Sequence, residues 1–189
     1  MARKKFSPKG KFSLVELIRS NRSTVIAFLI FATSITVSFF ILITHILDRY
    51  FIYPFTVSVA KTAGVVLKLF GMKTSVYGTI LRTPEASLNI GTGCNGIEAV
   101  VIFISAILAF PTGWKNKMWG LLWGFVGIFI INQSRVIGLF LINLHAPQHL
   151  DLAHTYIGQT YVIIAGLALW ILWAEGISHA RQKVSAPAV

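Results

Sequence analysis

The chain is short of charged residues. Asp, Glu, Lys and Arg make up 12% of the 189 residues, whereas hydrophobic residues make up 55% and the mean hydropathy is +0.72. Charged residues are about a quarter of a typical soluble domain, so this composition excludes an ordinary soluble protein. The sequence predicts an all-α membrane protein.

Acidic residues are the scarcest charges, with 6 Asp and Glu against 17 Lys and Arg and a net charge of +11. Such an excess suits either nucleic acid or an anionic membrane surface. Seven of the basic residues precede the first apolar run: Arg3, Lys4, Lys5, Lys9, Lys11, Arg19 and Arg22. Because basic residues gather on the cytoplasmic side of a span, we expect a membrane anchor and no nucleic-acid partner.

Only one cysteine is present, Cys94, so no disulfide can form within the chain. His145, His149 and His154 lie within ten residues, but they include no His-x-x-x-His pair with a carboxylate on the same face. A metal site is therefore the less favoured interpretation of these histidines, and we expect no metal and no cofactor.

Three segments are long and almost free of charge, at 24–47, 118–144 and 155–173, and each can cross a bilayer. The run 94–110 is shorter and contains Glu98, but its apolar density predicts a fourth span. The first span is too long for a signal peptide and lacks a small-residue cleavage site, so we expect it to remain as a helix.

The distribution of basic residues predicts which segments lie on the cytoplasmic side of the membrane. Those in the N-terminus, in the turn at 112–117 and in the tail predict that both ends are cytoplasmic, although the long outer connection holds five more. The expected divisions are a basic cytoplasmic N-terminus (1–23), the first span (24–47), an outer connection (48–93), a membrane core with the site (94–174) and a cytoplasmic tail (175–189).

Within the outer connection, 51–72 resembles a helix with Lys61 and Lys68 on one face, which favours a position along the membrane interface. A fifth span is the alternative, because the stretch is apolar enough to cross. The Gly, Pro and Thr content of 74–90, with its alternating apolar residues, predicts a small β-hairpin or loop.

Cys94 is placed where the 94–110 helix opens, at its outer end. Amides and the dipole at a helix N-terminus favour an anion, so we expect a lowered thiol pKa and a better nucleophile. Gly93 and Gly96 allow close approach, and Asn95 can cap the helix or donate to an oxyanion. Taken alone, a lone cysteine in a membrane helix is more often a small apolar filler.

Arg135 lies inside an otherwise uncharged span, in "INQSRVIGLF". A guanidinium there costs about 2.5–3.5 kcal/mol unless it faces a cavity or a partner. The alternatives to a catalytic role are a snorkelling side chain or a pair with Glu98, one turn below Cys94. Counted from the 112–117 turn at 1.5 Å per residue, Cys94 and Arg135 both rise roughly 26 Å, to the same outer level.

His154 reaches this level from the last span, since it ends the outer loop "HAPQHLDLAH". A cysteine that attacks an acyl carbon needs a base and an acid, and a histidine serves as both. Arg135 can stabilise the tetrahedral intermediate. Asp151 could orient the imidazole or act as a helix N-cap.

Three motifs in this order, "GCNGIEA", "NQSRV" and "HTYIG", resemble the exosortase and archaeosortase family of membrane cysteine transpeptidases, and the short length is most similar to exosortase H. The resemblance covers residues 90–158. It implies a catalytic Cys94, Arg135 and His154 that cleave a C-terminal sorting signal through a thioester and transfer the acyl group to an acceptor. Supporting residues would be Asn95, Gly96, Glu98, Asn132 and Asp151.

The resemblance also implies partners and a location. The substrates would be exported proteins with a short C-terminal motif, a hydrophobic helix and a basic tail. Membrane lipid surrounds the enzyme, and the amine acceptor stays open. The expected location is a bacterial inner membrane with the site at its outer face. Asn95 departs from the Ser or Thr common in the family, and the spans are fewer than in longer members.

Two other classes of function are alternatives: a small transporter or channel subunit, and a non-catalytic assembly factor. A transporter needs a polar path to both faces, whereas the polar residues here gather in the outer half. An assembly factor would not need Cys94.

Overall fold

A computed structural model describes residues 21–185, with side-chain surroundings for 21–178. The basic segment 1–20 and the last residues 186–189 lie outside the described residues, as do the side chains of Arg181 and Lys183. The helices are α2 (Arg22–Ile43), α3 (Tyr53–Leu69), α4 (Ile97–Ala109), α5 (Trp114–His145), α6 (Leu150–Leu152) and α7 (Gln159–Ser185). Short helical turns precede three of them: η1 (Asp48–Ile52), η2 (Pro147–His149) and η3 (Ala153–Gly158).

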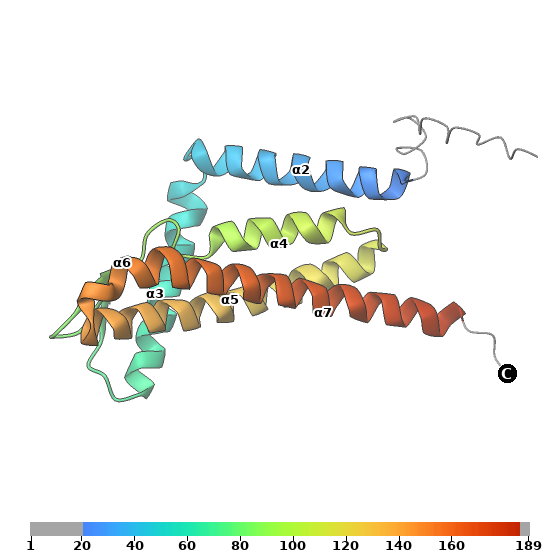
Figure 1. The fold of residues 1–189 in the computed structure, drawn as a ribbon. Coiled ribbons are helices and arrows are strands. Elements are labelled where there is room, and N and C mark those ends of the chain that lie inside the picture. The colour runs from blue at the N-terminus through green and yellow to red at the C-terminus, as the bar shows by residue number, and fades with distance from the viewer. Residues whose placement is uncertain (1–20, 186–189) are drawn as a thin grey trace, which may run out of the picture.

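Four of these helices run alongside one another, α2, α4, α5 and α7, and α3 runs across one end of this bundle (Figure 1). α2 packs mainly on α4, where Ser34 Oγ and Ser105 Oγ lie 3.1 Å apart. None of the α2 residues is buried within the protein. An apolar helix with so much exposed surface is stable only where lipid covers it.

By length and composition, four helical segments can cross a membrane: Arg22–Ile43, Asp48–Leu69, Trp114–His145 and Pro147–Ser178. The chain is therefore an integral membrane protein. The segment 94–110, expected as a span, forms a helix of only 13 residues, about 20 Å long against a hydrocarbon core of about 30 Å. Its start is delayed by a left-handed Gly96, and it stops before Pro111.

The crosswise course of α3 is what an interfacial helix requires, although its length would also allow a span (Figure 1). Its buried residues recur at helical spacing and form one face: Thr56, Val59, Ala60, Ala63, Gly64 and Leu67. Lys61 and Lys68 are exposed on the other side. The buried face packs on α5 and on a small sheet, so α3 closes one end of the bundle.

The segment 74–90 forms a three-stranded antiparallel sheet of β1 (Ser75–Tyr77), β2 (Ile80–Arg82) and β3 (Ser87–Asn89). The hairpin prediction is confirmed, with one strand more than a hairpin has. Leu81 is fully buried, and a Cβ at Gly64 would lie 2.7 Å from Val76, so the sheet packs tightly on α3. The sheet leads the chain to the turn that holds Cys94.

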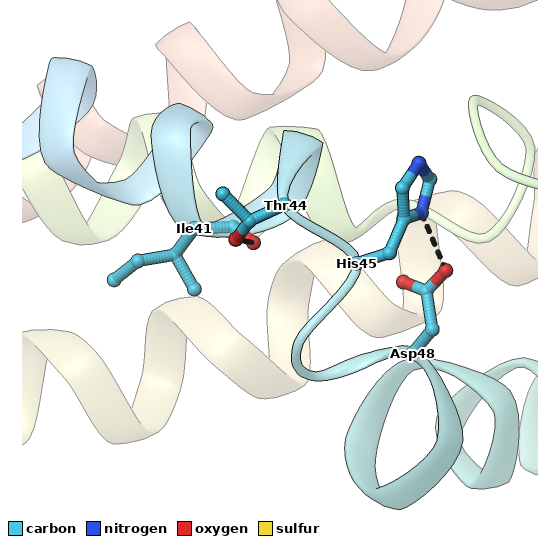
Figure 2. A network of polar contacts seen from close by, with 4 residues as sticks. All are labelled: Ile41, Thr44, His45 and Asp48. Carbon is cyan, nitrogen blue, oxygen red and sulfur yellow. Dashed lines mark hydrogen bonds and ion pairs between the residues drawn. The ribbon is translucent and has the colours of Figure 1, made fainter.

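The connection from α2 to α3 is a short, tight turn (Figure 2). His45 has a φ of 57°, in the left-handed region that ends many helices. Its Nδ1 lies 2.6 Å from Asp48 Oδ2, and Thr44 Oγ1 donates to Ile41 O at 2.8 Å. These local contacts turn the chain from the bundle direction into the crosswise α3.

Candidate active site

Cys94 lies in a turn between two glycines in the left-handed region, Gly93 with φ 81° and Gly96 with φ 83°. The Cys94 amide donates to Gly91 O at 3.1 Å. Because α4 begins only at Ile97, Cys94 precedes the first helical turn rather than opening it. This position before the helix corrects the expectation that Cys94 opens it, and the side chain is only 3% exposed.

Asn95 ties this turn to the crosswise helix. Its Nδ2 donates to Thr56 Oγ1 at 3.0 Å, and its Oδ1 accepts from the Ile97 amide at 3.1 Å. The Thr56 hydroxyl in turn donates to Ile52 O at 2.8 Å. Asn95 therefore satisfies the first amide of α4 and anchors it to α3 through a chain of buried hydrogen bonds.

Asn132 supports the turn from α5. Its Nδ2 donates to the Cys94 carbonyl at 3.2 Å, and its Oδ1 is buried without a partner. A Cβ at Gly96 would lie 2.7 Å from Asn132 Cγ. Position 96 therefore requires a glycine for two reasons: its positive φ and the close approach of α5.

Arg135 is 5% exposed and joins three segments. Its Nη1 donates to Gly93 O at 2.9 Å, and its Nη2 donates to His154 O at 3.3 Å and to Gln159 Oε1 at 3.4 Å. The Nε is buried and has no hydrogen-bond partner. This N–H is enclosed by protein and has no exposed surface.

The ion pair between Glu98 and Arg135, one of the alternatives to a catalytic role of Arg135, is not present among the described residues. Glu98 Oε1 instead accepts from the Gly93 amide at 3.0 Å. Both charged groups therefore bind the backbone of Gly93. The Arg135 guanidinium donates to its carbonyl, and the Glu98 carboxylate accepts from its amide.

His154 lies half-buried on η3, a π-helical turn of a kind often found at functional sites. Its backbone carbonyl binds Arg135. Among the contacts of the described residues, no hydrogen bond joins the imidazole to Cys94 Sγ. Catalytic hydrogen bonds are often long before substrate binds, so this geometry leaves His154 eligible.

Gly158, the last residue of η3, packs closely against the guanidinium of Arg135. A Cβ there would lie 2.8 Å from Arg135 Nε and 3.0 Å from Ala153 O. Asp151 is exposed on α6 and makes no hydrogen bond to His154 in the described part of the chain, so neither the orienting role nor a capping bond is present. No group of three metal-ligating side chains gathers among the residues described.

The environment of Cys94 also corrects the expected electrostatics. Burial raises the pKa of the Cys94 thiol, the Arg135 charge lowers it, and the Glu98 carboxylate raises it again. Desolvation outweighs the cation because the thiolate has almost no access to water. The thiol is therefore mostly protonated at neutral pH and needs a base.

Sequence reasoning missed Thr56, Gln159 and the packing role of Gly158. Thr56 lies 39 residues from Asn95, and nothing local marks it. Gln159 follows "HTYIG" directly, so its position next to a motif was the available signal. Thr56 lies on the buried face of α3. Sequence reasoning would have found it only by predicting that this face of the helix packs against the rest of the protein.

The bundle and the buried Cys94–Arg135 turn define a multi-span membrane protein with a thiol site at one end. The model of the transmembrane exosortase family matches residues 19–174. The chain belongs to this family. Neither the curated proteins nor the solved structures include a match to the chain.

Proposed function

We propose that this exosortase-type membrane protein is a cysteine transpeptidase that cleaves C-terminal sorting signals of exported proteins. The observation that carries the proposal is the Cys94 turn, where a buried thiol lies under the charge of an arginine whose Nε has no partner. A water-poor setting beside an arginine suits acyl transfer.

In the first step, Cys94 Sγ attacks the scissile carbonyl carbon while the thiol proton passes to His154. The carbonyl becomes a tetrahedral oxyanion, and the positive charge of the Arg135 guanidinium beside the Cys94 turn stabilises it. His154 then gives its proton to the leaving amine as the C–N bond breaks, which leaves a thioester on Cys94.

In the second step, an amine or water attacks the thioester and loses a proton to His154. The Cys94 thiolate leaves and recovers that proton. The raised thiol pKa suits this cycle, because the resting site holds a neutral thiol and creates charge only when substrate is present.

Substrate reaches the thiol from the side of the two glycines before it. A Cβ at Gly91 or Gly93 would meet no atom within 4 Å, so open space flanks the turn there. An extended peptide backbone fits beside glycines because they carry no side chains. The opposite side is closed by Asn132 and Thr56.

We place the site at the outer face of a bacterial inner membrane, with both termini cytoplasmic. The Lys115 and Lys117 turn and the basic end of the chain support this orientation. The proposed partners are exported proteins that carry a short motif, a hydrophobic helix and a basic tail, together with an amine acceptor.

Co-expression with a C-terminally tagged candidate substrate tests the function. The wild type should shorten the substrate by the mass of its C-terminal signal, and Cys94→Ala should leave it intact while remaining inserted. Cys94→Ser should retain little activity, since an alcohol is a poorer nucleophile. Full maturation with Cys94→Ala would favour the assembly-factor alternative.

A further inference from the structure

An apolar groove of about 570 Å³ lies between α2, α4 and α7, away from the Cys94 turn. Small side chains form much of its wall, including Ala27, Ala99, Ala106 and Gly166. Its volume is within the range of small-molecule sites. Its lining holds no charged residue, so it suits a hydrocarbon chain.

The groove continues into a second hollow of about 450 Å³ at the end of the bundle where α4 turns into α5. The two hollows share Ala27, Ala109, Phe110 and Pro111. Arg22 and Lys117 line the second one, and its lining includes no carboxylate. A cationic mouth thus opens onto an apolar cleft.

Within the part of the chain that the structure describes, both basic side chains keep donors for a ligand. The Lys117 ammonium donates to Leu108 O, which uses one of its three hydrogens. The Arg22 guanidinium carries five N–H groups at the same hollow. An anionic headgroup would be bound by charge and by hydrogen bonds together.

Aromatic side chains close the groove near its junction with the second hollow. Trp170 of α7 and Phe110 both line it, and their rings pack edge to face with centroids 6.0 Å apart. Their apolar ring surfaces suit contact with an acyl chain.

We propose that this groove, with its cationic mouth, is a binding site for an anionic phospholipid. The phosphate lies between Arg22 and Lys117, and one acyl chain runs along α4 between α2 and α7. A membrane-spanning protein helix fits less well, because its cytoplasmic flank is usually basic and would be repelled here. The lipid would fasten α2, which is otherwise held mainly by α4, to the rest of the bundle.

The test measures lipids bound to the purified full-length protein by native mass spectrometry. Dioleoyl phosphatidylglycerol should bind and dioleoyl phosphatidylcholine should bind at least tenfold more weakly. The double change Arg22→Gln with Lys117→Gln should weaken phosphatidylglycerol binding roughly 30-fold. The matched control, Lys61→Gln with Lys68→Gln on the exposed face of α3, should change it less than twofold.

A second pair of variants tests the acyl-chain half of the site. A Cβ at Gly166 would meet no atom within 4 Å, and Gly166 lines the groove, so we expect Gly166→Leu to fill the groove without disturbing the fold. Gly176→Leu, equally free of neighbours on the same helix but outside the groove, is the control. Gly166→Leu should lower phosphatidylglycerol binding at least tenfold.

Four results would overturn the proposal. Equal binding of the two lipids would remove the role of the cationic mouth, and unchanged binding in Gly166→Leu would remove the role of the groove. Full competition by millimolar inorganic phosphate would mean a simple anion site. A change of oligomeric state in Gly166→Leu with lipid binding intact would assign the groove to a second copy of the chain.

Discussion

Arg135 and Glu98 both form hydrogen bonds with the backbone of Gly93. The guanidinium Nη1 donates to the carbonyl of Gly93 at 2.9 Å, and the carboxylate accepts from its amide at 3.0 Å. The peptide units on both sides of this glycine are therefore fixed, and the next residue is Cys94. Two opposite charges position the thiol through the backbone while they shift its pKa in opposite directions.

The first prediction concerns this electrostatic balance. Glu98→Gln keeps an acceptor for the Gly93 amide but removes the negative charge that raises the Cys94 pKa, so the pKa should fall. Arg135→Gln removes the charge that lowers it, so the pKa should rise. Because only the thiolate is alkylated, the rate of iodoacetamide labelling against pH should shift to lower pH in the first variant and to higher pH in the second. Shifts in the reverse directions would contradict the charge assignment.

The second prediction tests whether position 96 requires a glycine. Gly96→Ala places a Cβ 2.7 Å from Asn132 at a positive φ, which costs about 1–3 kcal/mol in backbone strain alone. We expect a lower thermal unfolding midpoint and at least tenfold slower substrate processing. Gly138→Ala on α5 has open space at its Cβ and is the matched control, with near wild-type behaviour. Equal effects of the two changes would show that the Asn132 contact is unimportant.

The third prediction tests the link between α3 and the Cys94 turn. Thr56→Val keeps the shape but leaves the Asn95 amide without its buried acceptor, at a cost of about 1–3 kcal/mol. Processing should fall and Cys94 should be labelled faster as the turn loosens. Thr56→Ser should restore both, and Ser58→Ala, which removes an exposed hydroxyl on the same helix, should change neither. Wild-type labelling of Thr56→Val would rule out a positioning role for the hydroxyl.

The fourth prediction distinguishes His154 from the other loop histidines. His154→Gln should slow processing roughly 100-fold, because it removes the proposed proton carrier while keeping similar size. The pH profile of the wild type should be bell-shaped, and the limb that belongs to the imidazole should vanish. His149→Gln, which is exposed, is the control. An unchanged rate and profile in His154→Gln would transfer the role to another group.

The fifth prediction concerns topology. A reporter fused after Val189 should be cytoplasmic if α3 lies along the interface and α2, α4, α5 and α7 each carry the chain across. For α4 this needs the adjoining turn at 110–113 as well, because the helix alone is shorter than the hydrocarbon core. A membrane-impermeant thiol reagent should label Cys94 slowly from outside intact cells, since the thiol is 3% exposed. A reporter on the outer side would mean that α3 or a further segment crosses the membrane.

Much of this architecture follows from local sequence alone. Long uncharged runs predict α2, α5 and α7 because hydropathy and helix length are properties of neighbouring residues. The Gly, Pro and Thr content of 74–90 likewise predicts the small strands. The order of the three motifs around Cys94, Arg135 and His154 indicates the family, which the match over 19–174 then shows.

Only the tertiary structure decides what surrounds the thiol. Gly96 delays α4 by three residues, so Cys94 becomes a buried turn residue whose pKa is raised rather than lowered. The partner of Glu98 is a backbone amide, and that of Asn95 is a hydroxyl 39 residues away. Hydropathy and periodicity do not predict these contacts, because burial and long-range hydrogen bonds depend on how helices pack. The sequence by itself determines which groups are available, and packing determines which of them meet.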